Sequence, residues 1–149
     1  MTHGATGLGS YEAWAELQAG TVLPSVTLEV TEQTVILVPV STWDLFPGHH
    51  SPAYARSQGQ PDMYLNTIAL QGFVDRAITD HLGPDAWVRR RKIAMVDSVY
   101  PGDEIRGTAT ILAVRRGGES VEVDATVEVS TDRGVAVRAE STTHRYRSQ

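Results

Sequence analysis

Asp44 and His49 place a carboxylate and an imidazole five positions apart in the polar stretch 43–55. Pro47 and Gly48 stand between them. Because proline fixes φ and glycine permits unusual φ values, we expect a shaped loop here rather than a helical turn. Such a loop can direct both side chains at one point. The pair suits general acid–base chemistry, since histidine titrates near neutral pH and a carboxylate can orient it or share a water molecule with it.

The same residue types also occur in ordinary loops, so the rest of the chain has to decide between the two interpretations. Its 149 residues suffice for one domain with its own core. The net charge of −5 gives no support to nucleic-acid binding. The absence of cysteine excludes a disulfide framework, a cysteine-based zinc site and a thiol nucleophile, and we assign no metal site.

Membrane and export signals are also missing from the sequence. No apolar run approaches the ~20 residues of a membrane span. The first ten residues lack the basic and apolar regions of a signal peptide. A cytoplasmic protein without membrane contact is therefore the default expectation.

The N-terminal third is predicted to contain one short helix, over residues 11–19, and two strands, over 26–30 and 34–40. The second strand depends on the β-branched run 35–38, which is long enough for a buried strand and short for a helix. Pro39 weakens that prediction at the end of the strand. We divide the chain into an extension with a short helix, residues 1–24, and a main domain, residues 25–149.

One long helix is predicted after the polar stretch, over residues 67–82, where apolar side chains recur at helical spacing. Asn66 can cap its start, and the pair Gly83 and Pro84 ends it. A shorter helix is expected to begin at Pro52, with Ser51 as its cap.

The last 65 residues are predicted to be entirely β, with strands over 86–96, 105–114, 120–130 and 135–143 and hairpin turns at 116–119 and 132–134. Along 121–129, apolar and polar residues alternate, as expected for an antiparallel sheet with one buried face. A sheet that wraps around the single long helix buries the apolar faces of both. We therefore predict an α+β domain.

This order of elements, together with three motifs, resembles the MaoC-like hot-dog hydratases and dehydratases. Residues 44–49 read Asp-Leu-Phe-Pro-Gly-His, similar to the family's Asp-x-Asn-Pro-x-His. Residues 51–55 match the short helix that follows this motif, and 100–105 contain the Pro-Gly-Asp turn that opens a late strand in many hot-dog proteins. The resemblance covers about residues 26–145. It implies a single hot-dog fold, in which an antiparallel β-sheet wraps around one long central helix.

Within that family, the chain resembles the small subunit of the heteromeric enoyl-CoA hydratase of actinobacterial steroid side-chain degradation. The shared features lie at residues 49–50, 62–66 and 79–84. The chain departs from most of the family at Phe46, where an asparagine is usual. It also has Asn66 and Thr67 where the family usually has His-Gly.

The resemblance implies addition of water across the double bond of a 2-enoyl thioester, or the reverse reaction. Asp44 and His49 would act as acid and base on one water molecule. The backbone N–H of Thr67, at the positive end of the long helix, would stabilise the developing enolate oxygen. The substrate would be carried on coenzyme A or acyl carrier protein, with no other cofactor.

Five further residues are candidates for substrate contact, and each has a structural alternative. His50 points away from His49 if the segment is extended, whereas a core role for Tyr64 and a capping role for Asn66 are the simpler interpretations. Basic residues 89–92 can meet the phosphates of coenzyme A or simply form a solvated face. The predicted substrate-binding set is His50, Phe46, Tyr64, Asn66 and Arg90.

Other functions stay open at this point. A hot-dog thioesterase would place an acidic residue on the central helix, where Asp75 is available but lies beyond the first two turns. An enzyme that adds a different nucleophile to an enoyl thioester, or a subunit of a hetero-oligomeric hydratase, are further alternatives. Because a sheet around one helix leaves unpaired edges, we expect a homodimer or a heteromer with a second hot-dog subunit.

Overall fold

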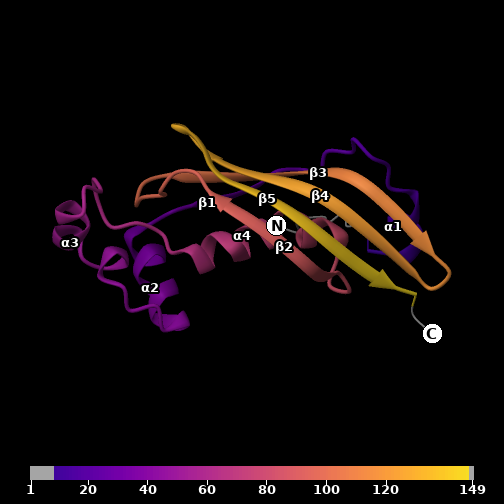
Figure 1. The fold of residues 1–149 in the computed structure, drawn as a ribbon, viewed down its shortest axis with the longest axis horizontal. Coiled ribbons are helices and arrows are strands. Elements are labelled where there is room, and N and C mark those ends of the chain that lie inside the picture. The colour runs from indigo at the N-terminus through magenta and orange to yellow at the C-terminus, as the bar shows by residue number, and fades with distance from the viewer. Residues whose placement is uncertain (1–8, 148–149) are drawn as a thin grey trace, which may run out of the picture.

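The computed structural model describes residues 9–147, so the predictions for residues 1–8 lie outside the described part of the chain. Figure 1 shows how the elements are arranged. In chain order they are α1 (Tyr11–Glu16), β1 (Val26–Glu29), α2 (Glu32–Thr42), the 3₁₀ turn η1 (Pro47–His49), α3 (Pro52–Ser57), α4 (Thr67–Leu82), β2 (Trp87–Met95), β3 (Glu104–Gly117), β4 (Ser120–Thr131) and β5 (Gly134–Tyr146).

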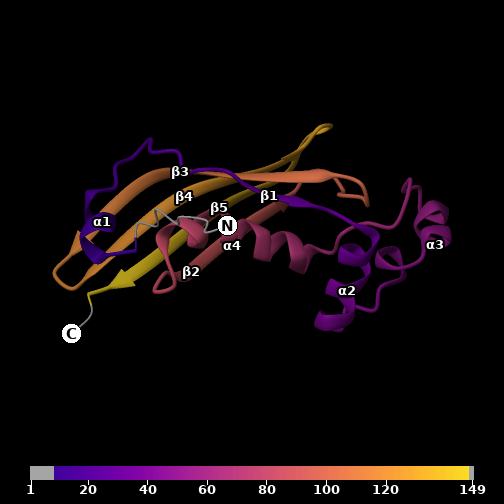
Figure 2. The ribbon, with the colours of Figure 1, turned by 180° about the vertical axis from the view of Figure 1, so that it is seen from behind.

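The five strands form one antiparallel sheet in the order β1-β3-β4-β5-β2. Helix α4 lies across one face of this sheet, while α2 and α3 group together beyond its end (Figures 1 and 2). Gly107 of β3 permits a close approach of the helix, because a Cβ there would lie 3.0 Å from the Phe73 ring and 3.3 Å from the Ala77 Cβ. This is the predicted hot-dog arrangement, with the core between helix and sheet.

Helix α4 has the predicted bounds. The Asn66 side chain accepts a hydrogen bond from the Ala69 N–H at the start, and Gly83 follows the last turn with φ of +90°. The buried residues recur along one face of the helix and include Phe73, Val74 and Ala77. The sheet strands likewise lie within a few residues of their predicted ranges.

The N-terminal segment packs against the same core. Trp14 of α1 is buried, and its indole N–H donates to the Leu82 carbonyl at 2.8 Å. Beyond α1, the Gly20 N–H donates to the Ile111 carbonyl at 2.8 Å, so the chain runs beside β3 before β1 begins. The helix ends three residues earlier than the predicted residue 19. No helix within residues 9–147 combines the length and apolar character that crossing a membrane requires.

The strand predicted over residues 34–40 is wrong, because these residues belong to helix α2. The Thr31 side chain accepts a hydrogen bond from the Thr34 N–H and starts the helix. Val35 and Pro39, four positions apart, are then buried on one side. β-Propensity largely reflects packing against neighbours, and here the available apolar surface lies beside α4 rather than along a free sheet edge.

Candidate active site

Asp44 follows directly on α2, where the chain changes direction. Trp43 ends the helix in the left-handed region with φ of 55°, which is rare for a bulky residue and found at turns and strained functional segments. The Asp44 N–H then donates to the Pro39 carbonyl at 3.0 Å. The backbone at Trp43 thus turns the carboxylate back toward the start of α4.

His49 ends a single 3₁₀ turn, η1, so the stretch around Pro47 is partly helical, contrary to the expected irregular loop. The His49 side chain is almost completely buried. Its Nδ1 lies 2.7 Å from the Tyr64 carbonyl oxygen, and because a carbonyl only accepts, Nδ1 must carry a proton. The neutral ring therefore presents the lone pair of Nε2.

The Nε2 atom of His49 lies 3.4 Å from Oδ2 of Asp44, so the structure brings the predicted pair together. With the tautomer set by Tyr64, both facing atoms are acceptors. Two acceptors at this spacing are satisfied by a water molecule that donates one proton to each, or by protonation of the imidazole. The Asp44 side chain is 30% exposed, which leaves the pair open to a small molecule from one side.

Asn66 connects this pair to the start of α4. Its Nδ2 donates to Asp44 Oδ2 at 3.2 Å and to Thr42 Oγ1 at 3.3 Å, while its Oδ1 caps the helix. The residue is completely buried. Asn66 is therefore a positioning group in this structure, and its predicted substrate contact stays a prediction.

The backbone N–H of Thr67 is the first of α4. Thr67 is exposed, and within the described residues no backbone hydrogen bond uses its N–H. Free amides at a helix start favour negative charge. The preceding residue, Asn66, hydrogen-bonds Asp44 through its side chain, so the helix start adjoins the segment that carries the pair, and the oxyanion role of the Thr67 amide stays a prediction.

An aromatic cluster surrounds the imidazole. The ring of Phe46 meets those of His49 and Tyr54 edge-on, with centroids 5.5 and 5.6 Å apart, and the Tyr64 ring lies 5.0 Å from that of His49. A Cβ at Gly48 would come within 2.5 Å of the Phe46 ring and 2.9 Å of the Tyr64 hydroxyl. Glycine is therefore required at position 48 as long as Phe46 occupies that space.

Tyr64 contributes to the site through both its backbone and its phenol. Burial raises the pKa of the phenol, and the neighbouring Tyr54, Tyr100 and Asp44 raise it further. The hydroxyl thus keeps its proton at neutral pH and is a donor. Phe46 is 42% exposed and, like Tyr64, packs against the His49 ring, and contact of either residue with substrate stays a prediction.

Two of the predicted substrate-binding residues, His50 and Arg90, do not lie with the Asp44–His49 pair in the structure. The His50 side chain is exposed, and no hydrogen bond of that side chain is found within residues 9–147. Arg90 pairs with Thr142 in β5, next to a register shift in β2, and it lies with Glu122 and Asp124 on the outer sheet face. Since α4 covers the other face, the structure does not bring Arg90 to Asp44 and His49 of the same chain.

Asp75, the residue that a thioesterase would use, is engaged elsewhere. Its carboxylate forms an ion pair with Arg91 of β2, whose guanidinium also donates to the Gln71 side chain at 3.0 Å. An attacking or activating carboxylate needs to face the thioester without such a partner, so this ion pair argues against the thioesterase alternative. Within the described residues, no group of three His, Cys, Asp or Glu side chains is arranged to hold a metal ion.

Residues 16–133 match the protein family described as MaoC like domain. The chain belongs to this family. The match covers both Asp44 and His49 and extends through most of the sheet. The MaoC-like assignment agrees with the resemblance that the short motifs indicate.

MaoC-like proteins from mycobacteria are among its relatives. The beta subunit of 3-oxo-4,17-pregnadiene-20-carboxyl-CoA hydratase of Mycobacterium tuberculosis (strain ATCC 25618 / H37Rv) is 28% identical over 104 residues, which cover 70% of this chain and 81% of the relative. The structure of the ChsH1-ChsH2 complex from Mycobacterium tuberculosis superposes with a TM-score of 0.79 at 25% identity, covering 87% of this chain and 98% of the other.

A bacterial R-hydratase shares the fold as well. The unliganded R-hydratase PhaJ1 from Pseudomonas aeruginosa superposes with a TM-score of 0.79, covering 91% of this chain and 86% of the other. Its identity is 20%, so this likeness concerns the MaoC-like fold alone.

Sequence reasoning did not assign the supporting residues of this MaoC-like site. Thr42 carries no signal, and Gly48 signals a shaped loop but not its close contact with Phe46 and Tyr64, because such contacts depend on which side chains the fold brings together. The capping position of Asn66 was a usable signal for its location. Its hydrogen bond to Asp44 depends on the path of α2, for which the sequence predicts a strand.

Proposed function

We propose that this MaoC-like protein catalyses the reversible addition of water to the double bond of a 2-enoyl thioester. One observation carries the proposal: Asp44 Oδ2 and His49 Nε2 face each other at 3.4 Å as two acceptors beside an open helix N-terminus. A water molecule held by both atoms has its protons engaged and its oxygen lone pairs directed outward. That is the arrangement a nucleophilic water requires.

In the hydration direction, the water oxygen bonds to Cβ of the enoyl group. The π electrons of the double bond move toward the thioester, which gives an enolate oxygen near the Thr67 N–H. His49 Nε2 takes one proton from the water, and the Asp44–His49 pair returns one proton to Cα. The pair therefore ends in its starting protonation state, and dehydration follows the same steps in reverse.

The substrate proposal is a thioester of coenzyme A or acyl carrier protein, with no other cofactor. The mycobacterial relative is a carboxyl-CoA hydratase subunit, and this supports a coenzyme A thioester. Phe46 and Tyr64 border the route to His49, and we assign the contact with the acyl group to them. Arg90 is not part of this proposal for a single chain, because it lies on the outer sheet face.

The acting species is proposed to contain a second hot-dog subunit. The likeness to the ChsH1-ChsH2 complex supports a heteromer, and a homodimer is the simpler alternative because two-fold dimers are the commonest oligomers.

The test measures loss of enoyl absorbance with crotonyl-CoA and longer 2-enoyl-CoA thioesters. We expect Asp44→Asn and His49→Ala each to lower kcat/KM by about 10²–10⁴-fold, the usual contribution of an acid–base group, without unfolding the protein. Asp80→Asn, which removes a carboxylate paired with Arg76 on the exposed side of α4, serves as the control. Rates within a few-fold of wild type in either site variant would overturn the assignment.

A further inference from the structure

Residues 97–103, between β2 and β3, connect to both segments that carry the site. On one side, the Gly102 N–H donates to the Val30 carbonyl at 2.7 Å, and the Val30 N–H donates to the Asp103 carbonyl at 2.8 Å. Val30 precedes Thr31, the cap of α2, and Asp44 follows the far end of that helix. The 97–103 loop therefore fixes where α2 begins.

The same loop holds the segment that orients His49. The Leu65 N–H donates to the Val99 carbonyl at 2.8 Å, and the Tyr100 hydroxyl donates to the Gln60 side chain at 2.6 Å. Leu65 directly follows Tyr64, whose carbonyl accepts the proton of His49 Nδ1. A displacement of the 97–103 loop is thus transmitted to the imidazole through two backbone positions.

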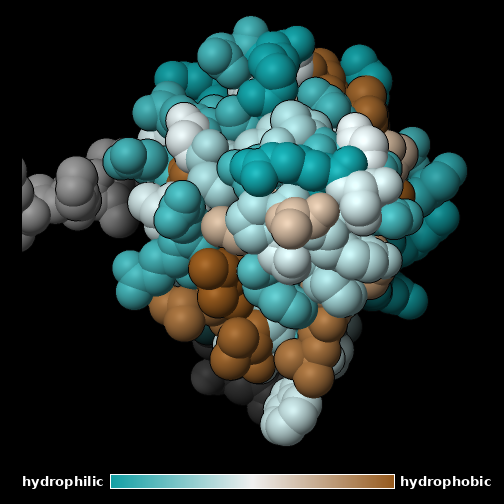
Figure 3. Space-filling view, turned by 90° about the vertical axis from the view of Figure 1, so that its left-hand side faces the viewer, coloured by the Kyte–Doolittle hydropathy of each residue, from teal (hydrophilic) through white to brown (hydrophobic). Residues whose placement is uncertain are grey.

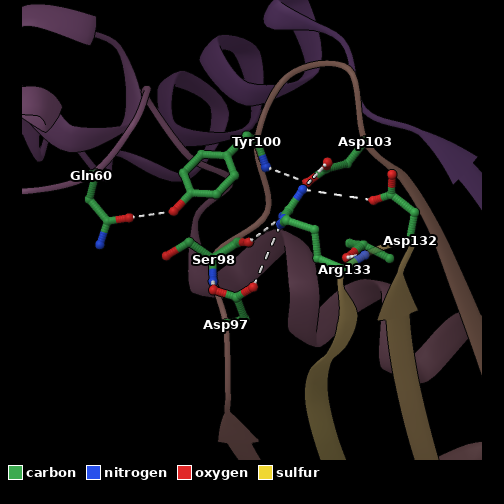
Figure 4. Close-up of polar contacts among 8 residues, drawn as sticks. Gln60, Asp97, Ser98, Tyr100, Asp103, Asp132 and Arg133 are labelled. Atoms are coloured by element: carbon green, nitrogen blue, oxygen red, sulfur yellow. Dashed lines mark hydrogen bonds and ion pairs between the residues drawn. The ribbon is translucent and has the colours of Figure 1, made fainter.

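Arg133, from the turn between β4 and β5, clamps this loop (Figure 4). Its guanidinium donates to the two carboxylate oxygens of Asp103 at 2.5 and 2.8 Å and to the Ser98 carbonyl at 3.0 Å. It also lies 5.1 Å from the centroid of the Tyr100 ring. The Asp103 side chain is 9% exposed and accepts a further hydrogen bond from the Tyr100 N–H at 2.8 Å.

This arrangement needs the shape of arginine. The planar guanidinium forms two parallel bonds to one carboxylate and still reaches a carbonyl and an aromatic face, whereas the ammonium of lysine is a point charge. The bonds from Arg133 hold the pKa of the Asp103 carboxyl below its usual range, in keeping with a persistent ion pair. Asp97 and Asp132 are the other charged groups that face Arg133.

We propose that Arg133 is a positioning residue for the Asp44–His49 pair, acting through the 97–103 loop. The proposal rests on the proposed hydratase function. Arg133 touches neither Asp44 nor His49 in the structure. Its effect is to hold the Tyr64 carbonyl and the start of α2 in their positions. Misplacement of a reacting group by about 1 Å can cost ~10²-fold in rate, so a modest shift of His49 is measurable.

The experiment compares Arg133→Met, Arg133→Lys and Asp103→Asn with Arg138→Met. Arg138 lies on β5, is 60% exposed and pairs with Glu128, so its loss is a matched control for removal of a surface arginine. We expect Arg133→Met and Asp103→Asn to lower kcat by about tenfold or more, with a smaller change in KM. Arg133→Lys should recover only part of that loss, and Arg138→Met should match wild type.

A readout without substrate separates positioning from simple stabilisation. The Nδ1–H proton of His49, hydrogen-bonded to Tyr64, can be followed by NMR in each folded variant. We expect this resonance to shift or exchange faster in Arg133→Met and to stay unchanged in Arg138→Met. Arg133→Lys and Asp103→Asn serve the same purpose if Arg133→Met does not fold.

A lowered Tm with unchanged kcat and unchanged His49 resonance would overturn the proposal and leave Arg133 as a clamp of the turn alone. A shifted resonance in a protein that hydrates no enoyl thioester would instead contradict the proposed function and leave the positioning role intact.

Discussion

Asn66 uses each of its polar side-chain atoms for a different task. One oxygen caps α4, while one nitrogen donates to Asp44 and Thr42. The residue therefore couples the proposed acid–base pair to the helix start that carries the Thr67 N–H. A change that keeps the cap and removes the donor separates these tasks.

Asn66→Asp is such a change. Aspartate caps helices as well as asparagine does, but it places a second carboxylate oxygen 3.2 Å from Asp44 Oδ2 where a donor stood. We expect activity to fall by about tenfold to a hundredfold. Because two carboxylates in contact disfavour joint ionisation, the acidic limb of the pH–rate profile should move to higher pH.

The check combines a pH–rate profile with thermal unfolding. Asn66→Ser, which keeps a cap but is too short to reach Asp44, should lower the rate without moving the acidic limb. A normal rate and profile in Asn66→Asp would mean that the bond to Asp44 has no functional role.

Among individual residues, the sequence predicted the Asp44–His49 pair but not the residues that hold it in place. Asp44 and His49 could be predicted from the sequence because their spacing and the intervening proline define a local motif. The sequence left open which face Arg90 takes, because a register shift in β2 decides it and no local pattern signals that shift. Arg133 and Asp103 lie 30 positions apart, and only the meeting of two loops reveals their pairing.

Among the elements, α4 has the most direct link to function, through its first N–H. Thr67→Pro removes that donor, whereas Thr67→Gly keeps it, and proline is tolerated at a first helical position. We expect Thr67→Pro to be about 10²–10³-fold slower than Thr67→Gly, the usual cost of one oxyanion donor. Steady-state rates with crotonyl-CoA, on variants shown to fold by circular dichroism, test this. Equal rates would remove the Thr67 amide from the mechanism.

The clamp between the β4–β5 turn and the 97–103 loop should also appear in acid stability. The pKa of Asp103 is lowered in the folded state, chiefly by the bonds from Arg133, relative to about 3.9 in an unfolded chain. A group of this kind stabilises the fold above the unfolded pKa and loses that contribution as pH falls through the folded pKa. Stability should therefore decline below about pH 4.

Urea unfolding at several pH values measures this contribution. Asp103→Asn should lower the free energy of unfolding by about 1–2 kcal/mol near neutral pH, a modest loss because Arg133 is 39% exposed. Below about pH 4, the unfolding free energy of this variant should vary less with pH than that of wild type. Asp132→Asn, at a carboxylate that is 89% exposed beside the same arginine, is the control and should retain the wild-type slope. If the unfolding free energy of Asp103→Asn changed with pH in parallel with that of wild type, Asp103 would not be the group responsible for the acid dependence.

The elements differed in how far the sequence predicted them. Helix α4 was predicted with its true bounds because cap, periodicity and stop signal agree. Helix α2 was missed because the run 35–38 favours a strand locally, while burial of Val35 and Pro39 on one side favours a helix. The strands of the sheet were predictable from alternation, whereas their order depends on long-range pairing.

For the whole molecule, the exposed apolar surface and the free sheet edge both indicate a partner. Helix α2 and the segment after it expose large apolar side chains, among them Leu37, Val40, Trp43 and Leu45. Figure 3 shows apolar surface gathered at this end of the molecule. Contiguous patches of this kind mark interaction sites more often than free surface. Among the residues that the structure describes, β2 is an edge strand that pairs with β5 alone, so one row of its backbone groups has no partner strand there.

Strand β2 runs back along α4 and ends at Met95, close to the segment that holds the site, since Val99 just beyond it contacts Leu65. A second hot-dog subunit that extends the sheet from β2 would therefore lie beside the site. Met95, 41% exposed, would be covered, whereas Leu112 on β3, 52% exposed, would not. These two residues form a matched pair for a test of assembly.

We expect the purified chain to have at least twice its 16.2 kDa mass by light scattering, alone or with a second hot-dog protein. Met95→Lys should weaken that assembly and lower activity together, because the site borders the shared edge, while Leu112→Lys should change neither. Activity that appears only after a second hot-dog protein is added would identify a heteromer. A mass of 16.2 kDa with full activity would show that the chain acts alone and that the free edge of β2 has no partner.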